Sequence, residues 1–451
     1  MDTVTIMTAM PMTIPSTAIN TMGRDKRSCL SLSPRMRRAM KWGKPMPMTA
    51  TKLAACLALM AAVSCSPAQQ GSEPLPVKAM SGFANEHIRV GAERMEEYLP
   101  MLDGLGVAVV SNQTGLVAGT HLVDTLLARG VRVVRVFAPE HGFRGEADAG
   151  AHVQDERDVR TGLPIVSLYG RNKKPTTAQM AGVDVVLFDI QDVGVRFYTY
   201  TSTLHYVMEA CAANEIRLVV LDRPNPNGFY VDGPVLDTAH RSFVGMHPVP
   251  LVHGLTIGEY ARMLNGEGWL AHGDTCMLTV VPCEGYTHAG LYELPVRPSP
   301  NLPNMAAVYL YPSLGLFEGT VVSVGRGTDQ PFQCIGYPGN PVGSFRFTPE
   351  PKPGAQAPPY EGRECRGLDL REFGEFYPRL RGALYPQWLI GMYEEAPDQA
   401  EFFTPFFDKL AGGPVLRQQL QAGWDEKRIR ASWQHDLDAF RKLREGYLLY
   451  P

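Results

Sequence analysis

The sequence lacks the short motifs that mark several large enzyme classes. It contains no GxGxxG after a first strand and no GxxxxGK[ST], so no nucleotide site is predicted. It has no GxSxG nucleophile elbow, which argues against an α/β-hydrolase. Its histidines form no HExxH, and its cysteines form no CxxC pair, so neither a zinc hydrolase nor a zinc knuckle is indicated. We therefore expect no cofactor and no metal.

The net charge and the cysteine content of the sequence are both low. A formal net charge of -3 provides no basic footprint, so nucleic acid is excluded as a partner. Five cysteines lie beyond the N-terminal region, an odd number that argues against a dense disulfide framework; they are Cys211, Cys276, Cys283, Cys334 and Cys365. One disulfide between Cys276 and Cys283 is an open alternative to five buried thiols. The length of 451 residues suits about two domains.

The N-terminus has the parts of an export signal. We expect residues 1–47 to be a leader outside the fold, 48–65 a signal segment, and 66–84 a linker. The apolar run 53–63 follows several lysines and ends at Ser64-Cys65, which resembles a bacterial lipoprotein box with Cys65 as the lipidated residue, although Ala62 stands where Leu is usual. A plain cleaved signal or a short membrane anchor is the alternative. We expect a lipid-anchored protein of the periplasmic cell envelope.

Four hydrophobic runs dominate the region that follows, and each ends in polar side chains. The runs are 106–110, 131–137, 183–188 and 216–221. They are rich in Val, Ile, Leu and Phe without strict alternation, as in strands covered on both faces. Helical patterns at 121–129, 202–214 and 256–266 lie between or after them, the last with a capping box at Thr256 and Glu259. We predict an α/β fold whose parallel strands all end at one cleft.

The second run leads into Glu140, His141 and Arg144, between Phe137 and Phe143. A glutamate in a partly apolar setting is suited to act as a general acid. The structural alternative is that Glu140 caps a helix or pairs with Arg144.

The other strand ends supply further candidates. Asn112 follows the first run, and Asp189, Asp192, Arg196 and Tyr198 follow the third. These side chains are suited to orient a polar ligand or to support a catalytic acid. Alternatively, one of the two aspartates pairs internally with Arg196.

The fourth run ends at Asp222 and Arg223 and continues into a rigid loop, where two prolines hold Asn225. Asp222 and Arg223 are ligand candidates or a structural ion pair. Further on, Asn301 and Arg326 lie in glycine- and proline-rich segments. Glu318 follows Leu-Phe and precedes glycine, a setting for a perturbed carboxyl or for a helix N-terminus.

Several long segments carry a family resemblance. They are SNQTG at 111–115, FAPEHGFRG at 137–145, TGLPIVSLYG at 161–170, DIQDVGVRFYTY at 189–200, LDRPNPNG at 221–228, HGLTIGEYA at 253–261, PSPNLP at 298–303 and LFEGT at 316–320. Together they resemble the NamZ-type exo-β-N-acetylmuramidases over residues 85–451, with Asn227 standing where Leu is common. The resemblance implies a Rossmann-like domain at 85–295, a smaller α+β domain at 296–451 that closes the cleft, and no nucleotide.

The resemblance also implies an activity, the release of N-acetylmuramic acid from the non-reducing end of peptidoglycan fragments. Glycoside hydrolysis usually needs two carboxyl groups. We predict Glu140 as general acid/base and Glu318 as the second carboxylate, with Asp192 or Asp189 as substitutes and His141 beside them. Assistance by the substrate's own N-acetyl group is an open alternative.

We expect the remaining polar candidates to bind substrate; they are Asn112, Arg144, Asp189, Arg196, Tyr198, Asp222, Arg223, Asn225, Asn301 and Arg326. An arginine is expected to bind the lactyl carboxylate of the sugar and so to select it. Among the four arginines, Arg196 is favoured over Arg144, Arg223 and Arg326. The alternative functions are a non-catalytic lipoprotein that binds muropeptides and an amidase or esterase acting on the same polymer.

Overall fold

The computed structural model describes residues 88–451, except for 141 and 145–155. The predicted leader, signal segment and Cys65 therefore lie outside the described residues, as does His141. The described part belongs to a single compact unit. No helix within it is long and apolar enough to cross a membrane.

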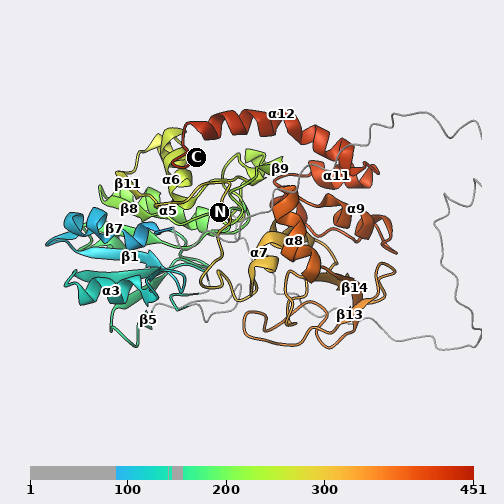
Figure 1. Ribbon diagram of the computed structural model, residues 1–451, viewed down its shortest axis with the longest axis horizontal. Helices are drawn as coiled ribbons and strands as arrows, with labels where there is room; N and C mark the ends of the chain where they lie inside the picture. The colour runs from blue at the N-terminus through green and yellow to red at the C-terminus, as the bar shows by residue number, and fades with distance from the viewer. Residues whose placement is uncertain (1–87, 141, 145–155) are drawn as a thin grey trace, which may run out of the picture. The chain divides into compact units, whose positions relative to one another are not determined.

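The main sheet consists of six parallel strands and one antiparallel edge strand (Figure 1). Its spatial order is β11-β8-β7-β1-β4-β6-β5. The strands are β1 (Val107–Ser111), β4 (Val133–Ala138), β5 (Glu156–Arg157), β6 (Pro164–Ser167), β7 (Val185–Asp189), β8 (Arg217–Leu221) and β11 (Leu278–Val281). In chain order the parallel strands lie 3-2-1-4-5-6, which is the Rossmann arrangement. The predicted fold class and all four predicted strands are confirmed, and these four are neighbours in the sheet.

Both faces of this sheet are buried, which explains the unbroken apolar runs. Val107 and Val109 of β1 point to one face and pack in a core with α3 (Leu122–Ala128). Ala108 and Val110 point to the other face and pack with α5 (Tyr200–Ala213) and α6 (Ile257–Gly266).

The three predicted helices are present as α3, α5 and α6. The capping box of α6 forms as predicted: Thr256 accepts a bond from the Glu259 amide, and the Glu259 carboxylate accepts one from the Thr256 amide. Sequence patterns missed β6 and β11 because each is only four residues long and carries polar or proline residues. The remaining elements up to residue 281 are α2 (Met95–Tyr98), α4 (Thr177–Met180), the short pairs β2 (Leu116–Val117) with β3 (Thr120–His121) and β9 (Asp232–Val235) with β10 (Pro250–Val252), and 3-10 turns at Gly91–Glu93, Leu99–Leu102, Thr238–His240 and Ala271–Gly273.

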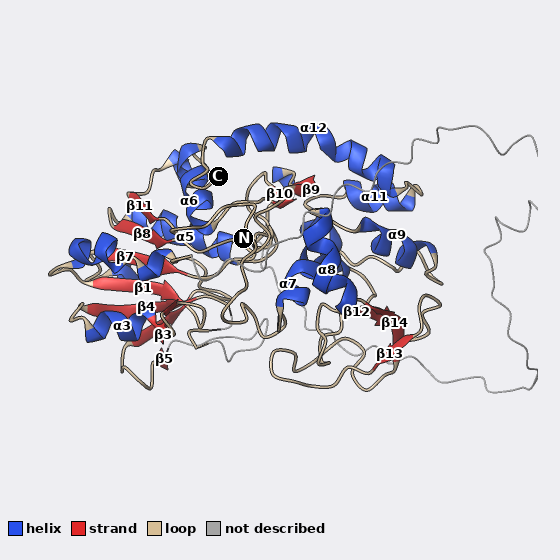
Figure 2. Cartoon of the chain, viewed as in Figure 1, coloured by secondary structure: helices blue, strands red, loops and turns tan. Residues whose placement is uncertain are grey.

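The C-terminal part combines helices with a small antiparallel sheet of order β12-β14-β13 (Figure 2). Its elements are α7 (Met305–Leu314), the 3-10 turn η7 (Gly315–Gly319), β12 (Cys334–Tyr337), β13 (Phe345–Phe347), β14 (Cys365–Asp369), α8 (Arg371–Arg381), α9 (Pro386–Glu394), α10 (Phe406–Ala411), α11 (Val415–Gln421) and α12 (Glu426–Glu445). Val308, Phe317 and Trp433 belong to the same hydrophobic core as the α5/α6 face of the main sheet. The core is therefore continuous across the boundary predicted near residue 295.

All five described cysteines are free and buried. The alternative of a Cys276–Cys283 disulfide is therefore wrong, and these thiols fill the core as small apolar groups.

The C-terminal tail is fastened to the end of β8. Helix α12 runs back toward α6 (Figure 1), and the Tyr450 hydroxyl donates to Asp222 Oδ2 at 2.6 Å. The other Asp222 bonds come from the Thr256 hydroxyl and from the amides of Arg223 and Gly258. Burial raises the pKa of Asp222 to about 6, against the effect of these bonds. Asp222 is fully buried with its oxygens bound within the protein, which favours a structural role over the predicted role in binding substrate.

Removing the Tyr450 hydroxyl tests this attachment. We expect Tyr450→Phe to lower the free energy of unfolding by about 1–3 kcal/mol, because a buried carboxyl loses a donor. Urea unfolding measures the change. Tyr447→Phe is the matched control, since its hydroxyl binds the partly exposed Glu267 and should contribute less. An equal loss in both variants would mean that the Asp222 contact has no special weight.

Candidate active site

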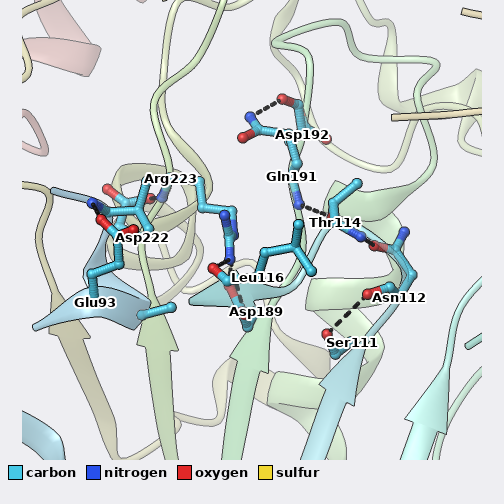
Figure 3. A network of polar contacts seen from close by, with 12 residues as sticks. Glu93, Ser111, Asn112, Thr114, Leu116, Asp189, Gln191, Asp192, Asp222 and Arg223 are labelled. Carbon is cyan, nitrogen blue, oxygen red and sulfur yellow. Dashed lines mark hydrogen bonds and ion pairs between the residues drawn. The ribbon is translucent and has the colours of Figure 1, made fainter. Parts of the chain in front are cut away.

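The loops that follow β1 and β7 diverge at the point where the strand order reverses (Figure 3). This is where open α/β sheets bind ligands. Asn112 joins the two loops: its Oδ1 accepts from the Thr114 hydroxyl at 2.6 Å, and that hydroxyl accepts from the Gln191 amide. Its Nδ2 donates to the Tyr200 hydroxyl at 2.8 Å. Asn112 is fully buried, and both atoms of its side-chain amide are bound within the protein.

Asp189 and Arg223 form a buried ion pair between the ends of β7 and β8. The guanidinium Nε donates to Asp189 Oδ1 at 2.6 Å, and a second bond joins Nη2 to Oδ2 at 3.0 Å. Figure 3 shows the two side chains directed at each other. The alternative of a structural ion pair between Asp222 and Arg223 is therefore wrong, because Arg223 pairs with Asp189. The charges of Asp189 and Arg223 are therefore satisfied by each other within the protein.

Arg196, the favoured ligand for a substrate carboxylate, is 1% exposed. Its guanidinium donates to the backbone carbonyls of Pro234, Val249 and Leu410, at 2.7, 2.8 and 3.0 Å. No aspartate among the described residues forms an ion pair with it, so the alternative of an internal pair with Asp189 or Asp192 is wrong. Burial lowers the pKa of Arg196 to about 10. Arg196 thus cross-links the two parts of the chain, and its predicted role in selectivity is not supported.

Three further candidates are also engaged within the protein. Arg144 forms an ion pair with Asp158 at 2.8 Å, not with Glu140. Asn225 donates to the Leu255 carbonyl, and Asn301 donates to the Gly354 carbonyl. These contacts fix loops around the cleft.

Glu140 and Glu318 remain, and both influence the same neighbouring side chains. Glu140 Oε2 accepts a bond from the Thr199 hydroxyl at 2.9 Å, and the Tyr169 hydroxyl also binds this carboxylate. Glu318 forms an ion pair with Arg326 at 2.7 Å. Burial, followed by the charges of Glu318 and Glu140, holds the pKa of Tyr311 well above its usual value. Both carboxylates therefore lie within electrostatic range of the same tyrosine.

Arg326 also lies near these carboxylates. Burial alone lowers its pKa, but the charge of Glu318, with a smaller contribution from Glu140, raises it overall. The guanidinium also lies over the Phe332 ring, 5.1 Å from its centroid. Arg326 is thus a predicted arginine ligand that pairs with Glu318 and also lies within electrostatic range of Glu140.

Asp192 lies deeper, behind a wall of tyrosines. Its Oδ1 accepts from the Gly194 amide at 2.7 Å, whereas its Oδ2 is buried with no hydrogen-bond partner among the described residues. Tyr198 belongs to the wall and donates its hydroxyl to the Pro298 carbonyl at 2.8 Å. Burial raises the pKa of Asp192 to about 7. A buried carboxyl is a less suitable substitute catalyst than the two half-buried glutamates.

Sequence reasoning missed three residues of the cleft: Tyr169, Thr199 and Tyr311. Tyr169 follows β6, a strand too short to recognise, and Thr199 carries no pattern of its own. Tyr311 is one of several apolar residues of α7 in the sequence. Proximity to Glu140 is the property that distinguishes them, and only the fold supplies it.

A separate groove of about 480 Å³ lies between the 293–305 loop, α7 and α8, and its lining contains none of the predicted site residues. Across the described part of the chain, no group of three His, Cys, Asp or Glu side chains is placed to hold a metal ion.

Comparison with known proteins identifies the family. The N-terminal profile of the exo-beta-N-acetylmuramidase NamZ matches residues 107–306, and the C-terminal profile matches residues 309–450. The chain belongs to the NamZ family. Its curated relative in Bacillus subtilis (strain 168), the peptidoglycan beta-N-acetylmuramidase NamZ, is 37% identical over 385 residues, which are 79% of this chain and 89% of the relative.

Two solved structures of DUF1343 family proteins from Bacteroides fragilis NCTC 9343 share the fold of this NamZ-family protein. BF0379 is 45% identical with a TM-score of 0.75, over 80% of this chain and 99% of its own. BF0371 is 29% identical with a TM-score of 0.68, over 81% and 99%. The two NamZ profiles meet near the start of α7, so Glu140 belongs to the N-terminal part and Glu318 to the C-terminal part.

The raised pKa of Asp192 makes a prediction about stability. An unfolded aspartate titrates near pH 4, and the folded one near pH 7. Between these values the folded protein holds the extra proton, so the free energy of unfolding falls as the pH rises. Asp192→Asn removes this titration.

From pH 5 to pH 8, we expect the wild type to lose roughly 1 to 3 kcal/mol more stability than Asp192→Asn. Urea unfolding of both proteins at the two pH values measures the difference. Asp222 titrates in both proteins, so its contribution to the pH dependence cancels in the comparison. The same pH dependence in wild type and variant would refute the assignment.

Proposed function

We propose that this protein is an exo-acting β-N-acetylmuramidase that releases N-acetylmuramic acid from the non-reducing end of peptidoglycan fragments. The observation that carries the proposal is that Glu140 and Glu318, each from a different half of a NamZ-family chain, lie within electrostatic range of the same tyrosine and the same arginine. Glycosidases cleave with two carboxyl groups on either side of the bond.

The surroundings of the two carboxylates suggest their roles. Glu140 is held by the neutral hydroxyls of Thr199 and Tyr169, and no cation forms an ion pair with it among the described residues. Glu318 is held by the Arg326 guanidinium. Different environments are how a pair of carboxyl groups divides acid and charged roles. We assign proton transfer to the leaving oxygen to Glu140, and stabilisation of the positive charge that develops on the sugar to Glu318.

A muropeptide-binding lipoprotein without catalysis is the alternative from another class. A protein that only binds muropeptides has no need for two carboxylates near each other. Such a pair would repel a sugar that itself carries a carboxylate. The release of free N-acetylmuramic acid from a MurNAc-GlcNAc disaccharide separates hydrolysis from binding, and from amidase or esterase activity.

Paired substitutions test the two roles. Glu140→Gln should lower kcat by about 10²-fold or more on substrates with poor leaving groups, the scale of lost acid catalysis. The decrease in kcat caused by Glu140→Gln should be smaller on 4-nitrophenyl muraminide, because its leaving group needs little protonation. Glu318→Gln should impair both substrates, because charge on the sugar develops in either case.

The matched control is Glu375→Gln, an exposed glutamate of α8 that should retain wild-type rates. Thermal unfolding establishes that each variant is folded. Wild-type turnover of the disaccharide by Glu140→Gln would remove Glu140 from the acid role. Unchanged rates of Glu318→Gln on both substrates would show that Glu318 does not stabilise the charge on the sugar.

We also propose that the protein is exported and tethered to the cell envelope through a lipid on Cys65. The support is the order of segments in the sequence: lysines, the apolar run 53–63, and Ser64-Cys65. Tethering would place the enzyme beside its polymer.

Cys65→Ala tests the anchor. We expect the variant to lose incorporation of labelled fatty acid and to leave the membrane fraction or remain unprocessed, because the thiol that accepts the lipid is missing. Cys56→Ala is the control, since Cys56 lies inside the apolar run. Labelling that persists in Cys65→Ala would show that another residue is lipidated.

A further inference from the structure

The proposed substrate carries one charge that other N-acetylated sugars lack. N-Acetylmuramic acid differs from N-acetylglucosamine by a lactyl ether with a carboxylate, and a cation is the simplest group to recognise it. Three of the four arginines considered from sequence are engaged elsewhere in the protein: Arg196 with carbonyls, Arg144 with Asp158, and Arg223 with Asp189. The fourth, Arg326, already neutralises Glu318.

Lys173 is a different kind of cation. It lies in the loop after β6 and is partly exposed, and its ammonium sits 4.6 Å from the centroid of the Phe243 ring. No carboxylate among the described residues forms an ion pair with it. Its neighbour Lys174 shows the contrast, because that ammonium binds Glu209 at 2.8 Å.

The position of Lys173 relates it to the catalytic carboxylate. Phe243 also contacts Tyr169, with ring centroids 6.4 Å apart, and the Tyr169 hydroxyl binds Glu140. Lys173, Phe243, Tyr169 and Glu140 thus form a continuous series, and all four side chains are partly exposed. In the proposed function Glu140 protonates the glycosidic oxygen, so two aromatic side chains separate Lys173 from the proton donor.

The surroundings of Lys173 favour an anionic ligand. Burial lowers the pKa of this ammonium, and no acidic group in the described part of the chain opposes the effect. An aromatic ring below a cation holds it without neutralising its charge. A carboxylate that arrives with the substrate would therefore supply the counter-ion.

We propose that Lys173, seated on the ring of Phe243, binds the lactyl carboxylate of the terminal sugar and selects muraminides. This inference rests on the proposed function and adds a specificity-determining residue to it. The lysine acts in binding and takes no part in proton transfer.

The test compares two substrates that differ only in this charge: 4-nitrophenyl N-acetylmuraminide and its lactyl carboxamide. Lys173→Met should lower kcat/KM for the acid by at least about tenfold, mainly through KM, because a partly desolvated charge loses its partner. The rate on the carboxamide should stay near that of the wild type. Lys173→Arg, which keeps the charge, should restore most of the activity on the acid. Lys174→Met is the matched control and should leave the ratio of the two substrates unchanged.

Two results would overturn the proposal: an equal loss on both substrates, which makes Lys173 structural, and an unchanged preference for the acid in Lys173→Met. Calorimetric titration with free N-acetylmuramic acid provides a readout that does not depend on turnover. If the wild type hydrolyses neither substrate, the proposed function fails; weaker binding of the acid to Lys173→Met than to the wild type still supports the lysine contact, and equal binding overturns it.

Discussion

The ion pair between Asp189 and Arg223 organises the edge of the sheet on which the cleft is built. Both side chains are buried, and the arginine also donates to the Leu116 carbonyl at 3.0 Å. One guanidinium therefore holds the end of β7, the end of β8 and the loop after β1. Loss of either partner would leave an uncompensated buried charge, which is far more costly than loss of an exposed pair. The polar contacts of Asn112, Thr114 and Gln191 depend on this framework, because they join two of the same three loops.

The second requirement is that the two halves of the chain share their interior. Glu318 is held in η7, directly after α7, and Val308 of α7 belongs to the same core as the strands of the main sheet. The placement of Glu318 relative to the main sheet thus depends on the packing of α7. An active site assembled in this way needs no flexible connection between domains.

Sequence was most informative where burial is strong and the segment is long. The four runs before Ser111, Ala138, Asp189 and Asp222 were recognisable because strands buried on both faces use apolar residues throughout. Strand β6 contributes only Ile165 and Val166 as apolar residues, too few to distinguish a strand from a loop. Tyr169, which follows it, was missed for the same reason.

Charged residues were a harder case. Glu140 and Glu318 could be nominated by their positions near aromatic residues and glycine, but their meeting depends on the packing of α7 against the sheet. Arg196 looked like a ligand because arginine suits carboxylates, yet its partners are backbone carbonyls, which every residue carries and no sequence pattern marks. Lys173 had no motif at all; its position beside Phe243 joins two loops that are distant in sequence.

Arg196 has a consequence for how substrate enters. Two of its carbonyl partners, Pro234 and Val249, lie in the same part of the chain as Arg196, whereas Leu410 lies on α10 in the C-terminal part. Separating the two parts would therefore remove one of the three bonds that satisfy a buried cation. Separation of the two parts at this point is therefore disfavoured. A ligand that leaves this contact intact spends little of its binding free energy on rearranging the protein.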